Sequence, residues 1–351
     1  MVQIKIKNRI VGHNLPPFIV AEAGINHNGE IEKALKMIQV AKESNADAIK
    51  FQTFKAEEFV GNKELTYTYL SQGKEITESM YELHKRYEFN PDEWRKIKNK
   101  CDDEDIIFLS TAQNRSDLDL LLKLDIPAIK VGSDDFTNIP LLKDYATTGL
   151  PILISCGMSH LGEIYETLNA IGSLDGYPTI LLLTTSLYPT SFEDVNLLRL
   201  KTLSESFSMI PLGFSDHTRG HLASSLAVAL GACLLEKHFT LDQNLPGPDH
   251  WFAENPESLK TWVDSIRKSY TILGNSIVRP TEQEELKMKN LARRSIVSLR
   301  DINEGEILNN ENIGLRRPGN GLPPKFMDYV LGTKATRKIF KQSLLKMGDF
   351  K

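Results

Sequence analysis

The amino-acid sequence predicts an α/β protein, a (β/α)8 TIM barrel followed by a small C-terminal β-rich domain. Three observations support this prediction. Eight short apolar runs are each followed by polar residues, segments with helical spacing separate them, and the runs span about the 250 residues that such a barrel needs. The runs lie at residues 18–21, 48–49, 106–109, 128–129, 152–154, 180–183, 212–214 and 232–235.

The segments between the runs have the spacing and the end signals of helices. Residues 31–44 place Leu35, Ile38 and Ala41 on one face, and residues 115–124 repeat this apolar period. Proline after a capping residue predicts a helix start, and glycine predicts a helix end. These end signals occur at Asn90 and Pro91, at Gly231 and at Gly274.

Further segments flank the barrel. Residues 2–11 alternate apolar with polar around Asn8, which predicts a hairpin closing the N-terminal mouth of the barrel. Residues 276–290 are rich in Glu and Lys and are predicted as a linker. The last sixty or so residues carry short β-like runs and a Gly-Asn-Gly turn, enough for a small domain that is marginal alone. The predicted domains are therefore 1–275 for the barrel, 276–290 for the linker and 291–351 for the tail.

The composition excludes several classes of partner. The formal net charge of the chain is −4, and its few clustered arginines form no basic stripe, so a nucleic-acid partner is not expected. No run approaches the roughly 20 apolar residues of a membrane span, and the N-terminus lacks a signal-peptide pattern, so we expect a cytoplasmic protein. The three cysteines lack zinc-type spacing and are expected to be reduced thiols. A small anionic ligand is the better expectation.

Two consecutive predicted strands end in a histidine, at His217 and His238. Because barrel strands end at one rim, we expect both imidazoles to bind one divalent metal ion with open coordination positions. Such an ion would act as a Lewis acid on a carbonyl group. Asp216 and Glu236 are expected to orient the imidazoles. Either histidine taken alone would more simply be satisfied by a backbone carbonyl, so the pairing carries this prediction.

Cationic and hydroxyl side chains gather at the same rim. Lys50 and Lys130 follow buried strands, so their stems would be buried and their ammonium groups would reach the pocket. Ser133, Ser155 and Ser215 add hydroxyl donors, although each alone could merely cap a turn. Together these groups suit a phosphate or phosphate-carboxylate ligand.

Glu22 follows the first strand and precedes a turn rich in glycine and asparagine. Its carboxylate is therefore expected to point into the pocket, where it would act as a base or an electrostatic stabiliser. The alternative is a structural salt bridge to Lys50.

Seven motifs follow one another along nearly the whole chain. They are EAGINHNG at 22–29, KFQTF at 50–54, KVGS at 130–133, GFSDHT at 213–218, EKHFTLD at 236–242, GPDH at 247–250 and RPGNG at 317–321. In this order they resemble the motifs of the bacterial sialic acid synthases, a family that includes N-acetylneuraminate, legionaminate and pseudaminate synthases.

The resemblance implies a reaction and its site. Phosphoenolpyruvate would condense with an open-chain 2-acetamido hexose, either N-acetylmannosamine or a 6-deoxy diacetamido analogue, giving a nine-carbon 2-keto acid and phosphate. Glu22 would do acid-base work, and His217 and His238 would bind Mn²⁺ in the first place, or Mg²⁺ or Co²⁺. Phosphoenolpyruvate would contact Lys50, Lys130, Ser133, Ser155, Ser186 and Ser215. The sugar would contact Gln52, Tyr188, Asp249 and Arg317.

The resemblance also implies an assembly. The tail would be an antifreeze-like (SAF) domain, and its Arg317 would reach the sugar in the partner's barrel of a domain-swapped homodimer.

Several positions depart from the usual pattern of this family, and they bear on the substrate more than on the reaction. The departures are Gln113 for phenylalanine, Asp134 and Asp135 for glycine and glutamate, Cys156 for threonine and Ser186 for asparagine. The short side chain of Ser186 leaves its contact with phosphoenolpyruvate open.

Three other functions remain open from the sequence. The first is a phosphoenolpyruvate-dependent synthase using an aldose phosphate, or a metal aldolase. The second is a non-catalytic sugar-binding protein, which would be expected to have lost Glu22, His217 or His238. The third is an ice-binding protein, but residues 291–351 lack a repetitive face of threonines.

Overall fold

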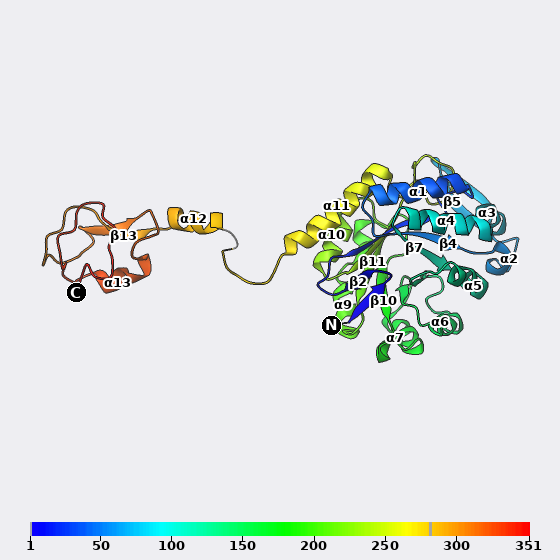
Figure 1. The fold of residues 1–351 in the computed structure, drawn as a ribbon, viewed down its shortest axis with the longest axis horizontal. Helices are drawn as coiled ribbons and strands as arrows, with labels where there is room; N and C mark the ends of the chain where they lie inside the picture. Colours follow the sequence, from blue (N-terminus) through cyan, green and yellow to red (C-terminus); the bar gives the residue numbers. More distant parts are fainter. Residues whose placement is uncertain (1, 281–282) are drawn as a thin grey trace. The chain divides into compact units, whose positions relative to one another are not determined.

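Eight parallel strands close into a barrel in the computed structural model of the chain, which describes residues 2–280 and 283–351 (Figure 1). A helix follows each strand, so the predicted (β/α)8 fold is confirmed. The strands are β3 Phe18–Gly24, β4 Ala48–Thr53, β7 Ile107–Ala112, β8 Ile129–Val131, β9 Ile152–Ser155, β10 Thr179–Thr184, β11 Leu212–Asp216 and β12 Leu234–His238. The helices that cover them are α1 Ile31–Glu43, α4 Pro91–Asp103, α5 Arg115–Lys123, α6 Ile139–Ala146, α7 Leu161–Ala170, α9 Arg199–Ser206, α10 Leu222–Ala229 and α11 Pro256–Leu273.

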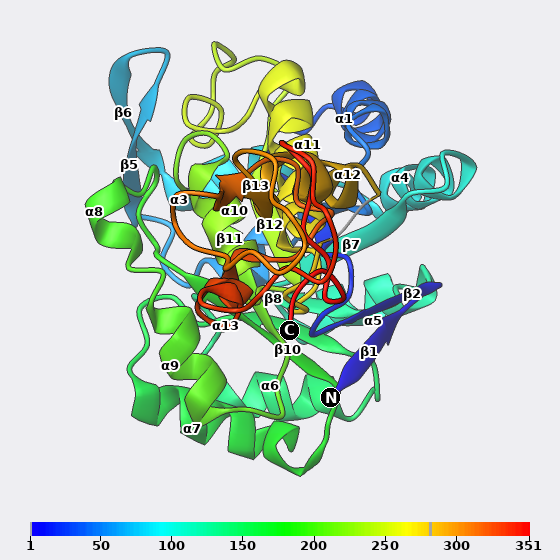
Figure 2. The same cartoon turned by 90° about the vertical axis from the view of Figure 1, so that its left-hand side faces the viewer.

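An insertion between β4 and α4 departs from this regular order, and the sequence analysis did not predict it. It contains α2 Ala56–Phe59, the antiparallel hairpin of β5 Thr66–Ser71 and β6 Lys74–Ser79, and α3 Met80–Tyr87. Gln72 and Gly73 both have positive φ and form the tight turn of the hairpin. Figure 2 shows the hairpin standing out from the barrel beside α3. We call residues 66–87, from β5 to α3, the arm.

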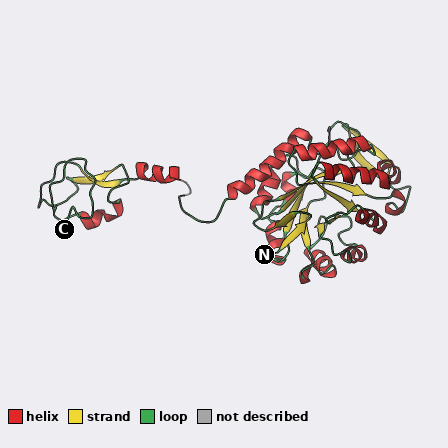
Figure 3. Cartoon of the chain, in the orientation of Figure 1, coloured by secondary structure: helices red, strands yellow, loops and turns green. Residues whose placement is uncertain are grey.

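The main apolar core lies between the strands and the surrounding helices, which Figure 3 shows as helices in red around strands in yellow. A second apolar cluster fills the N-terminal end of the barrel. The hairpin of β1 Gln3–Ile6 and β2 Arg9–Gly12 contributes Ile4, Ile6 and Val11 to this second cluster. The hairpin predicted over residues 2–11 is therefore confirmed, and it closes the N-terminal end.

The predicted helix signals have the expected geometry. The side chain of Asn90 accepts hydrogen bonds from the backbone N–H groups of Asp92 and Glu93 at 2.9 and 3.0 Å, and Glu93 bonds back to the Asn90 N–H. Gly231 and Gly274 have positive φ just after α10 and α11. Short helices add to the connections, namely η1 Ser173–Asp175 and α8 Phe192–Val195.

Contacts divide the chain after Gly274, and residues 275–351 form a second compact unit. This unit has its own apolar core, which includes Ile296, Ile302, Ile339 and Leu345. Its elements are α12 Gln283–Ala292, β13 Ser295–Ser298, β14 Ile313–Arg316, η2 Pro324–Phe326 and α13 Met327–Val330. Of the predicted linker 276–290, residues 281 and 282 lie outside the described residues, and α12 occupies the part that follows.

None of the helices in the described ranges has both the length and the apolar character needed to cross a membrane.

Candidate active site

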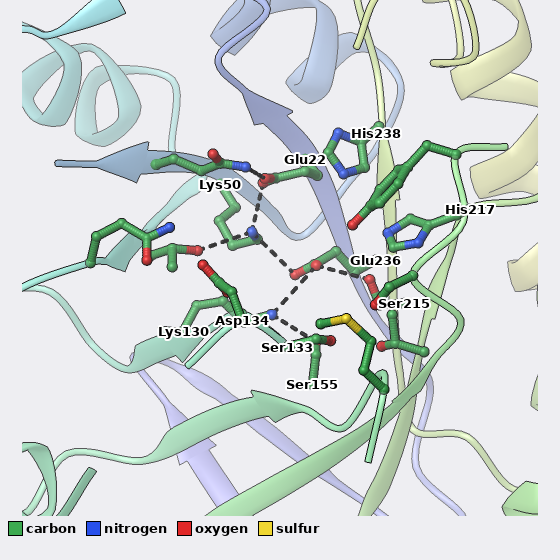
Figure 4. A pocket seen from close by; sticks show the side chains of 18 of the residues that line it. Glu22, Lys50, Lys130, Ser133, Asp134, Ser155, Ser215, His217, Glu236 and His238 are labelled. Atoms are coloured by element: carbon green, nitrogen blue, oxygen red, sulfur yellow. Dashed lines mark hydrogen bonds and ion pairs between the residues drawn. The ribbon is translucent and has the colours of Figure 1, made fainter. Parts of the chain in front are cut away.

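A polar cavity of about 410 Å³ lies at the C-terminal ends of the barrel strands (Figure 4). Successive side chains of a strand point to opposite sides, so residues two apart share the barrel interior. Together with the loops that follow the strands, this alternation brings eleven of the predicted site residues to one cavity. They are Glu22, Lys50, Gln52, Lys130, Ser133, Ser155, Ser186, Tyr188, Ser215, His217 and His238. Asp249 lines an adjoining cavity, and Arg317 belongs to the second unit.

Four buried charges form the floor of the cavity. The Lys50 ammonium lies 2.9 Å from a carboxylate oxygen of Glu22 and 3.7 Å from one of Glu236, and the Lys130 ammonium lies 3.7 Å from the other oxygen of Glu236. All four side chains are buried. An unpaired buried ion costs several kcal/mol, so the two cations and two anions stabilise one another in place. The alternative interpretation of Glu22, an ion pair with Lys50, is thus present within the cavity itself.

Burial and neighbouring charges move the pKa values of this cluster in different directions. Burial raises the pKa of Glu22, and the ammonium of Lys50 offsets this only in part. Burial would also raise the pKa of Glu236, but Lys130 and Lys50 outweigh it and lower that pKa. Burial lowers the pKa of Lys130. Glu22 is therefore the carboxyl group better suited to exchange a proton, and Glu236 stays ionised.

Serine hydroxyl groups surround the two lysines. Ser155 Oγ accepts from the Lys130 ammonium at 2.8 Å, and Ser215 Oγ donates to Glu236 at 3.1 Å. Ser133 Oγ accepts from the backbone N–H of Gly157 at 3.0 Å, and a Cβ on Gly157 would collide with the hydroxyl groups of Ser133 and Ser186. Within the described ranges the buried Ser186 hydroxyl has no hydrogen-bond partner. The hollow is therefore kept open by a glycine and offers donors to an anion.

The two histidines of the cavity are neutral imidazoles. His217 Nδ1 lies 2.8 Å from the carbonyl oxygen of Thr185, so Nδ1 carries the proton and Nε2 keeps its lone pair. The ring centroids of His217 and His238 are 5.5 Å apart. Burial, together with the other histidine for His217 and with Lys50 for His238, lowers the pKa of each to about 3. Both are therefore neutral at neutral pH, the state that binds metal.

The donor set fits a divalent ion with open coordination positions. His238 Nδ1 is buried without a hydrogen-bond partner in the described part of the chain. Its nearest carboxylate oxygen, from Asp249, lies 3.7 Å away. Among the described residues, no third His, Cys, Asp or Glu completes a metal cluster with the pair. A bound ion would thus take its other ligands from water or substrate.

The expectation that Asp216 orients an imidazole is wrong. Asp216 is the last residue of β11 and points outside the barrel. There it accepts hydrogen bonds from the hydroxyl groups of Thr218 and Ser224 and pairs with Lys237. Glu236 points inside, but its carboxylate contacts the two lysines and Ser215 rather than a histidine. The role predicted for Glu236 is thus replaced by one in the charge cluster.

Three predicted sugar contacts lie on the histidine side of the cavity. Gln52 donates to Glu22 at 3.0 Å, and the Tyr188 ring lies over His217 with centroids 4.2 Å apart. Asp249 has its pKa raised to about 7 by burial and by the charge of Glu22. These groups therefore lie around the two imidazoles.

The cavity also contains residues that the sequence analysis did not assign. Asp134 points into it beside the lysines, as Figure 4 shows, whereas Asp135 turns away and accepts from Asn138 at 2.9 Å. Lys50 donates to Thr111 at 3.3 Å. The strand-end alternation could have identified Thr111, but the loop conformation decides between the two aspartates. The other unassigned lining residues are Phe59, His84, Gln113, Gly132, Met158 and Thr184.

Comparison with known proteins agrees with this geometry. An uncharacterized protein of Methanocaldococcus jannaschii is 41% identical over 95% of this chain and 94% of its own length. N,N'-diacetyllegionaminic acid synthase of Legionella pneumophila is 38% identical over 93% of each chain. The solved structure of N-acetylneuraminic acid (sialic acid) synthetase from Leptospira borgpetersenii, in complex with citrate, is 34% identical, with a TM-score of 0.72 over 82% of this chain and 96% of that one.

Family models cover both units. The model of the SAF domain matches residues 293–351, and the model of the NeuB family matches residues 37–278, more than half of the chain. The chain therefore belongs to the NeuB family and carries a C-terminal SAF domain.

Proposed function

We propose that this protein is a nonulosonate synthase, which condenses phosphoenolpyruvate with an open-chain 2-acetamido hexose to give a nine-carbon 2-keto acid and phosphate. One observation carries the proposal: two buried lysines and a group of serine hydroxyls share one cavity with a pair of neutral histidines. The named relatives, which include a legionaminic acid synthase, support the same reaction class.

Phosphoenolpyruvate would lie on the lysine side. Lys50 and Lys130 supply positive charge, and Ser133, Ser155, Ser186 and Ser215 supply hydroxyl donors, a combination that suits a phosphate and a carboxylate. The unpartnered hydroxyl of Ser186 supports its inclusion despite its short side chain.

The sugar would lie on the histidine side, against Gln52, Tyr188 and Asp249. A divalent ion held by His217 and His238, with Mn²⁺ the first choice and Mg²⁺ or Co²⁺ alternatives, would supply Lewis-acid polarisation of the aldehyde. Holding two reactants in line contributes about 7–11 kcal/mol relative to free encounter, so much of the catalysis would come from this placement.

The bonds change in a simple order. C3 of phosphoenolpyruvate attacks the aldehyde carbon and forms the new carbon-carbon bond, which leaves C2 electron-deficient. Water adds to C2 and gives up its proton, for which Glu22 is the candidate acceptor because its pKa is raised. The bond between C2 and the bridging oxygen then breaks with its electron pair on the leaving phosphate, and the C2 hydroxyl loses its remaining proton as the keto group forms. The oxygen of the former aldehyde takes up a proton and becomes a hydroxyl group.

We also propose that the active assembly is a domain-swapped homodimer in the cytoplasm. In this assembly Arg317 of one protomer would contact the sugar in the partner's barrel. A guanidinium offers directed donors to an acetamide carbonyl.

The test combines product analysis with an isotope. Purified protein, Mn²⁺, phosphoenolpyruvate and a 2-acetamido hexose should give equal amounts of phosphate and keto acid. Heavy oxygen at the bridging position should appear in phosphate. Label retained in the keto acid would contradict attack at C2, and condensation of free pyruvate would identify an aldolase instead.

A further inference from the structure

The arm and the barrel enclose a second cavity of about 270 Å³ next to the first. The two cavities share lining residues, including Gln52, Tyr188 and His238, so they adjoin each other at the histidine pair. A ligand with its carbonyl at the histidine pair therefore reaches into the second cavity with its far end. Other lining residues of the second cavity are Ile25, Phe59, Tyr67, Met80, Leu83, His84, Pro248 and Asp249.

The wall of the second cavity is mostly apolar. Phe59, Met80 and Leu83 present aromatic and aliphatic groups, and the Tyr67 ring stacks on Tyr69 with centroids 5.6 Å apart. A sugar that carries only hydroxyl groups would leave such a wall poorly covered, and its hydroxyls would lose water without gaining partners. The wall instead suits a ligand with an apolar group at this end.

One imidazole on this wall has a defined protonation state. His84 Nδ1 lies 2.7 Å from the carbonyl oxygen of Met80, so Nδ1 donates, and Nε2 is left as a hydrogen-bond acceptor. Edge contacts with Phe54 and Phe59, at centroid distances of 5.0 and 4.9 Å, hold the ring in place. Burial lowers the pKa of His84, which keeps the ring neutral. No hydrogen-bond partner of Nε2 occurs in the described ranges.

A neutral acceptor beside an apolar wall matches the chemistry of an acylamino group. Its N–H can donate to Nε2 of His84 while its methyl group packs on Phe59 and Met80. A hydroxyl group could also donate to Nε2, but it would bring no methyl group to the wall. Filling or emptying such a space by one methyl-sized group changes selectivity by roughly ten- to two-hundredfold.

We propose that His84 is a specificity-determining residue that binds a second acylamino group of the acceptor sugar, so that the substrate is a diacetamido hexose. This inference rests on the proposed function and names the substrate class within it.

The experiment compares two acceptors of the same configuration that differ only in acetamido or hydroxyl at C4. Both carry the 2-acetamido group, and phosphate release from phosphoenolpyruvate gives kcat/KM for each. We expect the wild-type protein to prefer the diacetamido sugar by about tenfold or more. His84→Phe keeps an aromatic ring but no acceptor, so it should abolish the preference, because kcat/KM for the diacetamido sugar should fall about tenfold or more relative to kcat/KM for the monoacetamido sugar.

Two further variants and a control sharpen this test. His84→Gln retains an acceptor and should keep part of the preference, and Met80→Ala keeps the backbone carbonyl that holds His84 but opens the wall, so it should weaken the preference. His160→Phe replaces an exposed histidine just before α7 and should change neither rate.

Equal kcat/KM values of the wild-type protein for the two sugars would overturn the inference. It would also be overturned if His84→Phe lowered kcat/KM equally for both sugars while Met80→Ala kept the full preference. Absence of phosphate release with every acetamido hexose would instead overturn the proposed function, and this inference with it.

Discussion

The ammonium group of Lys237 lies 3.1 Å from the carboxylate of Asp216, and both side chains are buried outside the barrel wall. Each residue immediately precedes a histidine of the cavity, and the two residues pair directly across β11 and β12. Ser224 donates to Asp216 at 2.6 Å, and the Trp262 indole donates to Ser224 at 2.8 Å. This ion pair therefore holds β11 and β12 in the register that directs the two following imidazoles into the cavity.

Removing one member of that pair should destabilise the barrel. Asp216→Asn leaves the Lys237 ammonium buried with Glu254 as its nearest other carboxylate, 3.8 Å away. We expect the free energy of unfolding to fall by roughly 3–5 kcal/mol, as for other broken buried pairs. The double variant Asp216→Asn with Lys237→Met should lose less than the sum of the single variants, as denaturant titration would measure.

The matched control is an exposed pair. Lys201 and Glu205 lie 3.9 Å apart on the surface, and Glu205→Gln should cost less than about 1 kcal/mol. Strict additivity of the two buried substitutions would argue against a coupled pair.

The histidine pair predicts dependence on a metal ion. His217→Ala or His238→Ala should abolish phosphate release and lower the amount of Mn²⁺ bound, measured by calorimetry, because each removes one of the two proposed imidazole ligands. Phosphoenolpyruvate binding should largely persist, since the lysines proposed to bind it and most of the serines lie on other strands and loops than the histidines. His221→Ala, at an exposed position after β11, should keep both phosphate release and Mn²⁺ binding. Full activity after exhaustive chelation would remove the metal from the mechanism.

Glu22 should matter for the chemical step more than for binding. Glu22→Gln keeps the shape of the side chain but cannot accept a proton, so we expect kcat to fall by about 10²–10⁴ with KM for both substrates little changed. Single-turnover measurements would separate the two effects. Glu32→Gln, on the exposed face of α1, serves as the control. A variant at Glu22 with normal kcat would leave only the ion pair with Lys50 as its role.

His27 should make the barrel sensitive to acid. It is fully buried and stacks on Phe89, and burial, together with His250, lowers its pKa from 6.5 to about 3. A depressed histidine pKa means that the unfolded chain binds more protons, so this contribution to stability is complete above pH 6.5 and is lost as the pH falls from 6.5 towards 3. Between neutral pH and pH 5, the Tm of the His27→Phe variant should therefore fall less than the Tm of the wild-type protein.

The comparison of the two Tm profiles checks this sign directly. His160→Gln changes an exposed histidine and should leave the profile unchanged. Parallel profiles for His27→Phe and the wild-type protein would show that His27 does not titrate in this range.

The alternation of side chains along each strand made most of the site predictable. Once eight strand ends are assigned, residues two apart must share the interior, which places Lys50 with Gln52 and Ser215 with His217. The same alternation places Asp216 outside, a consequence that the sequence analysis overlooked. The choice of Asp134 over Asp135 depends on a loop conformation that no period describes.

The arm could not be predicted in the same way. Most of β5 and β6 is exposed or half-exposed, so these strands lack the apolar alternation that marks a buried strand face. His84 acquires its role only because the arm folds back beside Phe59 and Tyr188. The position of His84 depends on tertiary contacts, which the local sequence does not indicate.

Arg317 makes the proposed dimer testable. It lies in a Gly- and Pro-rich segment of the second unit, after β14. If it contacts the sugar, Arg317→Ala should raise KM for the sugar more than KM for phosphoenolpyruvate, because the guanidinium would bind the acetamide carbonyl. Arg316→Ala, the neighbouring exposed arginine, provides the control.

Mixed dimers decide which protomer supplies the arginine. Dimers of the Glu22→Gln chain and dimers of the Arg317→Ala chain are each impaired. If the arginine acts on the partner's barrel, a heterodimer contains one barrel with both an intact Glu22 and the partner's intact arginine. Random reassembly of equal amounts makes half of the dimers mixed, with one intact site of two, so activity should recover to about a quarter of the wild-type value. Subunit exchange would be verified with differently tagged chains. If exchange is verified and no activity is recovered, Arg317 acts in its own protomer or takes no part in the reaction. The reason is that a site completed by the partner subunit must regain activity when it contains both an intact Glu22 and an intact Arg317.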